Sequence, residues 1–167
     1  MNDLRLVIFK FNCLLYFLIL FFVLSFKGLK SENLGDLTKQ KPIDKVILLK
    51  GKNGENHFFS PNILNFQTGK LYKLQIKNES NSKHYFSSTK FSDSIFTRKV
   101  QISKNNKKIA EIKGNISEIE VFPNNIVEWW FVPIKTGIFE DLSCSVKDKI
   151  SKKKHNEMGM VGTIIIQ

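Results

Sequence analysis

The chain has 167 residues and a formal net charge of +11, and it contains two cysteines and three histidines. This length accommodates one ordinary domain, and a composition of 42% apolar and 25% charged residues excludes both a disordered chain and a polytopic membrane protein. Two cysteines exclude a disulfide-dense miniprotein and any four-cysteine zinc or iron–sulfur site.

The first part of the chain has the pattern of an export signal. Residues 11–26 carry no charge and follow Arg5 and Lys10, and a short basic region before an apolar core is typical of a secretory signal. No Ala-x-Ala cleavage site follows, and the apolar run over residues 6–26 approaches the length of a membrane-spanning helix. We therefore expect residues 1–31 to be a signal peptide or a membrane anchor, with the rest periplasmic or anchored facing the periplasm.

The remainder of the chain is basic and begins with a polar stretch. Without residues 1–31 it keeps 22 basic and 14 acidic residues, a net charge of +8. Such a charge favours anionic partners, and export argues against nucleic acid among them. Residues 32–44 are expected to be a linker and residues 45–167 a domain. This domain has a single cysteine, so it cannot form an intrachain disulfide.

From residue 45 onward the chain has the pattern of short β-strands. Residues 71–76 and 116–121 alternate apolar and polar side chains, as half-buried strands do, and residues 126–132 are aromatic and β-branched. Further strands are expected at residues 46–49, 57–59, 63–66, 137–142 and 163–166. Residues 88–99 interrupt the alternation and are expected to contain a short helix capped by Ser88 or Ser92. The fold prediction is an all-β Greek-key sandwich of seven or eight strands.

Side chains that bind soft metals cluster near the end of the chain. Cys144, His155, Met158 and Met160 lie within the last 24 residues, and His84 follows an expected strand after a polar turn. A thiolate, two imidazoles and a weak axial thioether form the trigonal site of blue copper proteins. The expected strands place the late donors in the loop that joins the last two strands. One end of the sandwich can therefore gather them with the early histidine.

These residues resemble the C-terminal signature of the cupredoxins, and most of all bacterial plastocyanin- and azurin-type copper-binding proteins. The matching stretches are Phe131–Gly137, Cys144, His155–Ile164 and, as the first-ligand motif, His84–Phe86. The resemblance covers about residues 45–167. It implies a cupredoxin-like sandwich that holds one copper ion per chain through His84, Cys144, His155 and Met160.

The loop between the two late ligands departs from the family pattern. Ten residues, 145–154, separate Cys144 from His155, where the family usually has two to four. Five of the ten are lysines, namely Lys147, Lys149, Lys152, Lys153 and Lys154. We expect the longer loop to loosen the preorganisation of the site, and we expect its charge to form a docking surface for an acidic redox partner such as a cytochrome or oxidase domain.

The other candidate site residues are expected to have packing or structural roles. Met158 is the alternative axial ligand but is expected to pack at the rim of the site. His57 precedes a turn, matches no ligand position and is expected to be structural. Trp129 and Trp130 are expected to be core and face aromatics.

No enzymatic site is apparent in the sequence. It contains no Ser–His–Asp set, paired carboxylates or phosphate-binding glycine loop, and it has too few histidines for a laccase-type oxidase and too few cysteines for a dinuclear copper centre. The expected function is that of a blue copper electron carrier. A copper storage or delivery protein for an oxidase and a metal-free, membrane-tethered sandwich are the alternatives.

Overall fold

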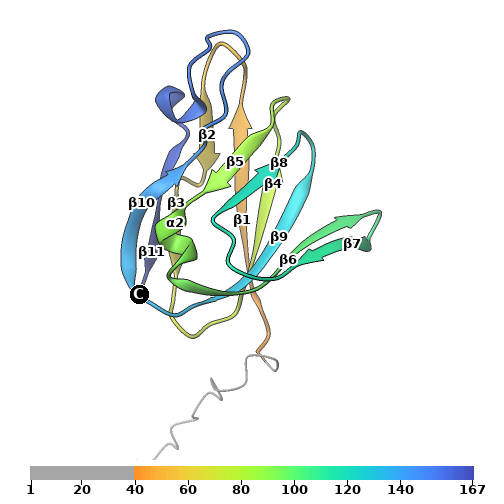
Figure 1. The fold of residues 1–167 in the computed structure, drawn as a ribbon, viewed down its shortest axis with the longest axis vertical. Helices are drawn as coiled ribbons and strands as arrows, with labels where there is room; N and C mark the ends of the chain where they lie inside the picture. Colours follow the sequence, from red (N-terminus) through yellow and green to blue (C-terminus); the bar gives the residue numbers. More distant parts are fainter. Residues whose placement is uncertain (1–39) are drawn as a thin grey trace, which may run out of the picture. The chain divides into compact units, whose positions relative to one another are not determined.

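The computed structural model describes residues 40–167, which form two β-sheets with little helix (Figure 1). The elements are β1 (Ile43–Gly51), β2 (His57–Ser60), β3 (Ile63–Phe66), β4 (Tyr72–Asn78), β5 (His84–Ser87), α2 (Thr89–Ser92), β6 (Ile95–Lys104), β7 (Lys107–Ile112), β8 (Glu118–Val121), β9 (Ile126–Pro133), β10 (Gly137–Ser143), the 3-10 helix η1 (His155–Met158) and β11 (Val161–Ile166). The predicted signal or anchor and most of the predicted linker lie outside the described residues. No helix in residues 40–167 has the length and apolar character needed to cross a membrane.

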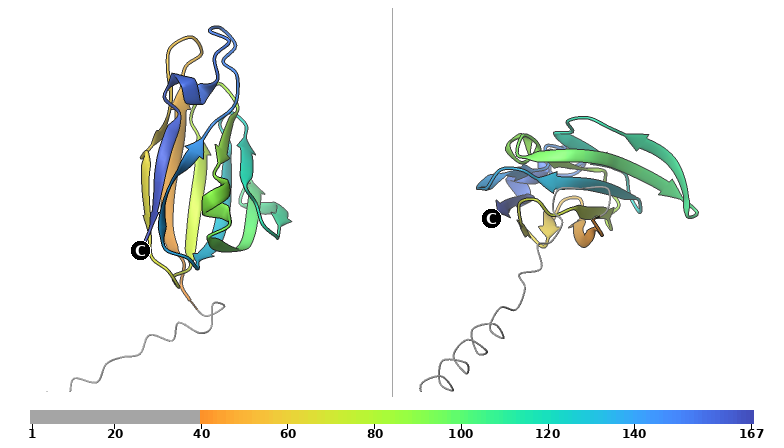
Figure 2. Two further views of the ribbon diagram at one scale, coloured as in Figure 1. Left: turned by 60° about the vertical axis from the view of Figure 1, so that its left-hand side comes forward. Right: turned by 90° about the horizontal axis from the view of Figure 1, so that it is seen from below.

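The two sheets pack face to face as a sandwich (Figure 2). One sheet has the strand order β2-β1-β4-β9-β6-β7 and the other has the order β3-β11-β10-β5-β8. Most neighbours are antiparallel, but β1 runs parallel to β4 and β3 runs parallel to β11. The predicted all-β sandwich is therefore confirmed, with eleven strands in the described residues rather than seven or eight.

The additional strands lie where the sequence pattern is weakest. Strands β6 and β7 form a hairpin in a region for which no strand was predicted, and most β7 side chains are exposed, so β7 shows no alternating burial. Asn105 and Asn106 form the connection with φ angles of +50° and +60°, as a two-residue type I′ turn requires. At the start of the described residues, β1 begins at Ile43, so residues 43 and 44 belong to a strand and not to the linker.

The short helix predicted within residues 88–99 forms over residues 89–92. Of the two proposed caps, Ser88 is the one observed, because its hydroxyl accepts a hydrogen bond from the backbone N–H of Phe91 at 3.3 Å. This bond satisfies one of the N–H groups left free at a helix start.

An aromatic cluster between the sheets forms the centre of the core. Trp129 is 1% exposed and makes edge contacts with Phe86, Phe91 and Phe131. Its neighbour Trp130 lies on the outer face, where the Lys99 ammonium is 4.6 Å from the ring centroid. The expectation of one core and one face tryptophan is thus met, and the alternation of β9 fixes which is which.

Candidate metal centre

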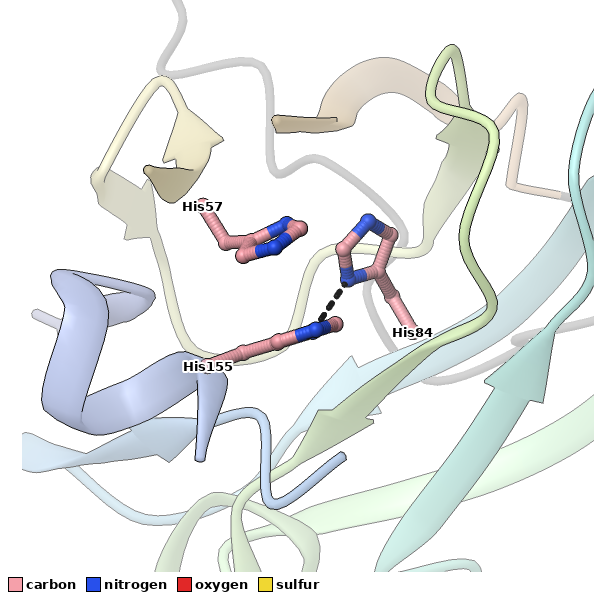
Figure 3. Close-up of side chains that lie close together, drawn as sticks. All are labelled: His57, His84 and His155. Carbon is pink, nitrogen blue, oxygen red and sulfur yellow. Dashed lines mark hydrogen bonds between the residues drawn. The ribbon is translucent and has the colours of Figure 1, made fainter. Parts of the chain in front are cut away.

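Three side chains from different parts of the chain meet at one end of the sandwich. His84 begins β5, Cys144 directly follows β10, and His155 begins η1. The Nδ1 atoms of His84 and His155 are 3.0 Å apart, and the Cys144 Sγ lies 3.8 Å and 3.5 Å from them, respectively. All three side chains are fully buried. Figure 3 shows the two imidazoles with their Nδ1 atoms facing each other.

The spacing of these atoms fits a single metal ion. Metal–nitrogen bonds of about 2.05 Å and a metal–sulfur bond of about 2.3 Å, at trigonal angles, space the ligand atoms by roughly 3.5 to 3.8 Å. The observed edges of 3.0, 3.5 and 3.8 Å come within about half an ångström of these values. One thiolate and two imidazoles in this arrangement are the donor set of a type 1 copper site.

The hydrogen bonds around His84 leave its Nδ1 atom free to bind a metal. The Ser80 hydroxyl is 2.7 Å from Nε2 of His84, and its single hydrogen is directed to Asn78 Oδ1 or to the Ser82 carbonyl. We therefore assign the hydrogen of His84 to Nε2, which donates it to Ser80. The lone pair of this imidazole is then on Nδ1, the atom that faces His155 and Cys144, as is usual for a ligating histidine.

Cys144 is held in place by its backbone neighbours. Its sulfur accepts a hydrogen bond from the backbone N–H of Tyr85 at 3.2 Å. Burial raises the pKa of the Cys144 thiol, and the N–H groups of Tyr85 and Val146 act in the opposite direction. A thiol in this position stays protonated until a metal displaces the proton, and the N–H donors then stabilise the thiolate.

Both imidazoles are neutral at ordinary pH. Burial, followed by the charges that His155 and His57 would carry, lowers the pKa of His84 from 6.5 to about 3. Burial, followed by the charge of His57, lowers the pKa of His155 to about 4. Near pH 7 neither ring therefore carries an extra proton. The hydrogen between the two Nδ1 atoms belongs to His155 and must move to its Nε2 before Nδ1 can bind a metal.

The two methionines differ in their surroundings. Met160 is fully buried in the core cluster that contains Cys144, and its backbone N–H donates to the carbonyl of His155. Met158 is half-buried, and its sulfur accepts a hydrogen bond from the Ser151 hydroxyl at 3.2 Å. The burial of Met160 in the core cluster of Cys144 agrees with the axial role predicted for it, and its ligation stays a prediction.

Substitution of Met160 is expected to change the reduction potential more than the stability. Met160→Leu conserves volume, so it should cost less than about 1.5 kcal/mol of folding free energy. Loss of a weak axial thioether should raise the copper potential while copper stays bound. Voltammetry of Met160→Leu beside Met158→Leu checks this expectation, and a larger shift in the Met158 variant would show that the axial assignment is wrong.

His57 lies at this centre, although it matches no ligand position in the sequence pattern. Its ring stacks on that of His155 with centroids 3.6 Å apart and an interplanar angle of 18°. One ring nitrogen from each of His57, His84 and His155 lies within 4.8 Å of the others. The signal that could have located His57 is the polar Gly51–Asn56 turn before it, which marks a hairpin end.

The long loop is fastened to the rest of the domain by Asp148, the one acid among its lysines. Its buried carboxylate accepts hydrogen bonds from the backbone of Gly54 and from the ring of His57. Burial would raise the pKa of Asp148, but hydrogen bonds from Ser151, His57 and Gly54 outweigh it and hold the pKa well below its usual value. These hydrogen bonds fasten the loop to the β1–β2 hairpin, and the expectation that its length loosens the site stays a prediction.

The five loop lysines all point outward. Lys147, Lys149, Lys152, Lys153 and Lys154 are exposed, and none forms an ion pair with a carboxylate in residues 40–167. None of them lies among the ligand atoms. His155, by contrast, is fully buried.

Comparison with known proteins identifies the fold. No protein-family model matches the chain, and no curated protein matches it in sequence. Among solved structures, a multi-copper oxidase from Pediococcus acidilactici aligns with 76% of this chain at 17% identity and a TM-score of 0.53. A copper nitrite reductase from Nitrosomonas europaea aligns with 83% of it at 12% identity and a TM-score of 0.50.

The chain spans 26% and 52% of the lengths of these two proteins, so each contains much that this chain lacks. At these identities the likeness establishes the arrangement of strands and not the activity. The sandwich found in residues 40–167 is thus shared with parts of two copper proteins, and the cluster of His84, His155 and Cys144 at its end fits one copper ion. The chain has the cupredoxin-like fold that its sequence predicted.

Proposed function

We propose that the domain is an exported type 1 copper protein that carries electrons. The observation that carries the proposal is the buried triangle of Cys144 Sγ and the Nδ1 atoms of His84 and His155. Bound copper would supply a one-electron redox couple. His84 and Cys144 are positioned by β5 and β10 of one sheet and His155 by η1, so the donor atoms are expected to move little between the two oxidation states.

Burial of the site favours electron transfer over copper delivery. All three donor side chains are fully buried, and Asp148 fastens the covering loop to the β1–β2 hairpin. An electron can cross a thin layer of protein, whereas an ion can leave only if the loop opens. Slow copper exchange is therefore expected, and this suits a carrier better than a protein that hands its metal to an oxidase.

Reconstitution of the purified domain with Cu(II) tests the proposal. We expect one copper per chain by elemental analysis, an intense thiolate charge-transfer band and a reversible reduction potential. Rapid electron exchange with a cytochrome, together with slow copper loss to a chelator, would support a carrier. Rapid copper loss with no electron exchange would support delivery, and a colourless protein that retains no copper would contradict both.

A basic, partly apolar cavity beside the centre is proposed to receive the redox partner. The cavity has a volume of about 330 Å³, and its lining includes three lysines and three apolar side chains: Lys83, Lys147, Lys149, Phe122, Pro123 and Val146. Val146 lies two residues after Cys144, so a bound partner would approach the thiolate side of the site. An acidic protein surface with an apolar contact is the chemistry that fits this lining.

Neutralisation of the loop lysines is expected to slow electron transfer to an acidic partner. Lys152→Gln, Lys153→Gln and Lys154→Gln together remove three charges, and clustered charge accelerates encounter by about tenfold or more. The effect should shrink at high salt, because the Debye length falls from about 10 Å at 0.1 M to about 3 Å at 1 M. Stopped-flow kinetics over this salt range checks it, with the copper spectrum unchanged.

A matched control removes the same charge elsewhere. Lys104, Lys107 and Lys108 lie at the tip of the β6–β7 hairpin, away from the loop in Figures 1 and 2. Their triple Gln variant has the same net charge as the loop variant. If both variants slow the reaction equally, total charge and not the loop guides the partner. If neither does, the loop is only a solvated surface.

A further inference from the structure

We propose that His57 is a positioning residue for the metal centre, which orients His155 by stacking and is itself held by Asp148. This inference rests on the proposed copper site and extends it beyond the residues that would bind the ion. It concerns the second ring nitrogen, Nε2, which has a hydrogen-bond partner in His84 but not in His155, and the contact that orients His155 in place of that partner.

The two imidazoles are oriented by different means. His84 donates from Nε2 to Ser80, and this hydrogen bond fixes the rotation of its ring. The corresponding Nε2 of His155 is buried and has no hydrogen-bond partner in residues 40–167. A ligating histidine almost always receives such a partner on its second nitrogen. Here the face of His57, 3.6 Å away and nearly parallel, restricts the tilt of the His155 ring instead.

The stacked arrangement makes His57 a neighbour of a ligand rather than a ligand. An imidazole lone pair lies in the plane of its ring, so two nearly parallel rings direct their lone pairs side by side and not toward one point. Nε2 of His57 is also engaged with Asp148 at 3.1 Å. The other nitrogen, Nδ1, lies beside Gly51, the residue paired with His57 across the hairpin, and it has no hydrogen-bond partner in residues 40–167.

Gly51 provides the space that the His57 ring occupies. Its φ angle is +146°, which few residues other than glycine adopt, and a Cβ atom there would collide with Nδ1 of His57. The same Cβ would collide with the Asn56 carbonyl and the His57 Cα, so the close hairpin backbone as well as the ring requires glycine here.

The carboxylate of Asp148 joins the hairpin to the loop with separate oxygens. Oδ2 accepts from the backbone N–H of Gly54 at 3.0 Å and from His57 at 3.1 Å. Oδ1 accepts from the backbone N–H groups of Ile150 and Ser151 at 2.9 Å and 2.6 Å. One oxygen thus shapes the loop, and the other holds the hairpin and the stacked ring in place.

Two substitutions of His57 separate stacking from ligation. His57→Phe keeps an aromatic face against His155 but loses the bond to Asp148, and His57→Ala loses both. We expect the Cu(II) EPR spectrum of the Phe variant to stay close to that of the unsubstituted protein, while the Ala variant shows altered copper hyperfine splitting. An equal change in both variants would show that the aromatic face of His57 is not what orients His155 and would overturn the proposal, as would no change in either.

The hydrogen bonds that Asp148 accepts from the hairpin and from the loop are called the clasp here. Asp148→Asn tests the clasp without removing a ring. An amide has one oxygen, so one of the two pairs of N–H donors must face an NH₂ group. Loss of a hydrogen bond to a charged group costs about 1.5 kcal/mol or more, so the loop should open more often. Copper release to a chelator should then become about tenfold faster. Asp141→Asn is the matched control, because Asp141 also accepts from a side chain and a backbone N–H, those of Ser88 and Lys90. Equal release rates in the two variants would contradict the clasp.

A measurement on the metal-free protein separates this inference from the proposed function. Amide hydrogen exchange of Gly54 reports on the bond between the hairpin and Asp148, and that of Ser151 reports on the loop. Both amides should be protected in the unsubstituted protein, and Asp148→Asn should expose at least one of them while Asp141→Asn exposes neither. Loss of copper binding with intact protection would refute only the copper site, and unprotected amides in the unsubstituted protein would refute the clasp.

Discussion

Cys144→Ser should abolish the intense visible absorption of the copper-loaded protein. The band arises from charge transfer between a thiolate and Cu(II), and a serine hydroxyl cannot supply the sulfur orbital. Copper affinity should fall by more than the roughly 10- to 100-fold that loss of a ligand's hydrogen-bonding partner typically costs. Absorption spectroscopy and elemental analysis of dialysed samples measure both effects.

The fold should tolerate this substitution. Serine is close in size to cysteine, and its oxygen can accept the N–H of Tyr85 that the sulfur accepts now. Circular dichroism should therefore show an unchanged β-sheet spectrum. A band that persists in Cys144→Ser, and again in Cys144→Ala, would mean that another group binds the copper.

Acid should destabilise the metal-free protein well above the pH at which carboxylates titrate. The folded pKa values of His84 and His155 are about 3 and about 4, below their ordinary value of 6.5, because the rings are buried. Unfolding exposes both rings, which then take up protons near pH 6.5. The folded state is therefore fully favoured above this pH and loses stability as the pH falls toward 4.

The expected size of this effect follows from two protons. Each contributes a slope of about 1.4 kcal/mol per pH unit below pH 6.5, so about 4 kcal/mol of unfolding free energy should be lost between pH 8 and pH 5. Urea titrations of the metal-free protein at a series of pH values measure the slope. His84→Gln should roughly halve it, and a flat profile would show that the folded protein accepts these protons.

The sequence predicted the elements whose side chains alternate and whose donors have distinctive chemistry. Strand β4 buries every second residue, and its pattern is visible without a structure. Cys144, His155 and His84 were located because thiol and imidazole groups are scarce in this chain. In both cases the information lies in residue type and local spacing.

The features that the sequence did not predict depend on long-range packing. His57 and Asp148 are 91 positions apart, and each is unremarkable in its own segment. Their contact exists because the β1–β2 hairpin and the long loop end at the same place. Strand β7 was missed for a different reason: its faces are mostly exposed, so no burial period marks it. Only its Asn-Asn turn signals the hairpin.

The gathering of every imidazole of the protein in one place gives the chain an experimental advantage. The full sequence contains three histidines, and all three belong to the cluster at the end of the sandwich. Selective ¹⁵N labelling of histidine would therefore yield ring resonances from this cluster alone, with no background from other parts of the protein. Tautomer, metal occupancy and ring motion could each be followed there, in the intact chain, without any substitution.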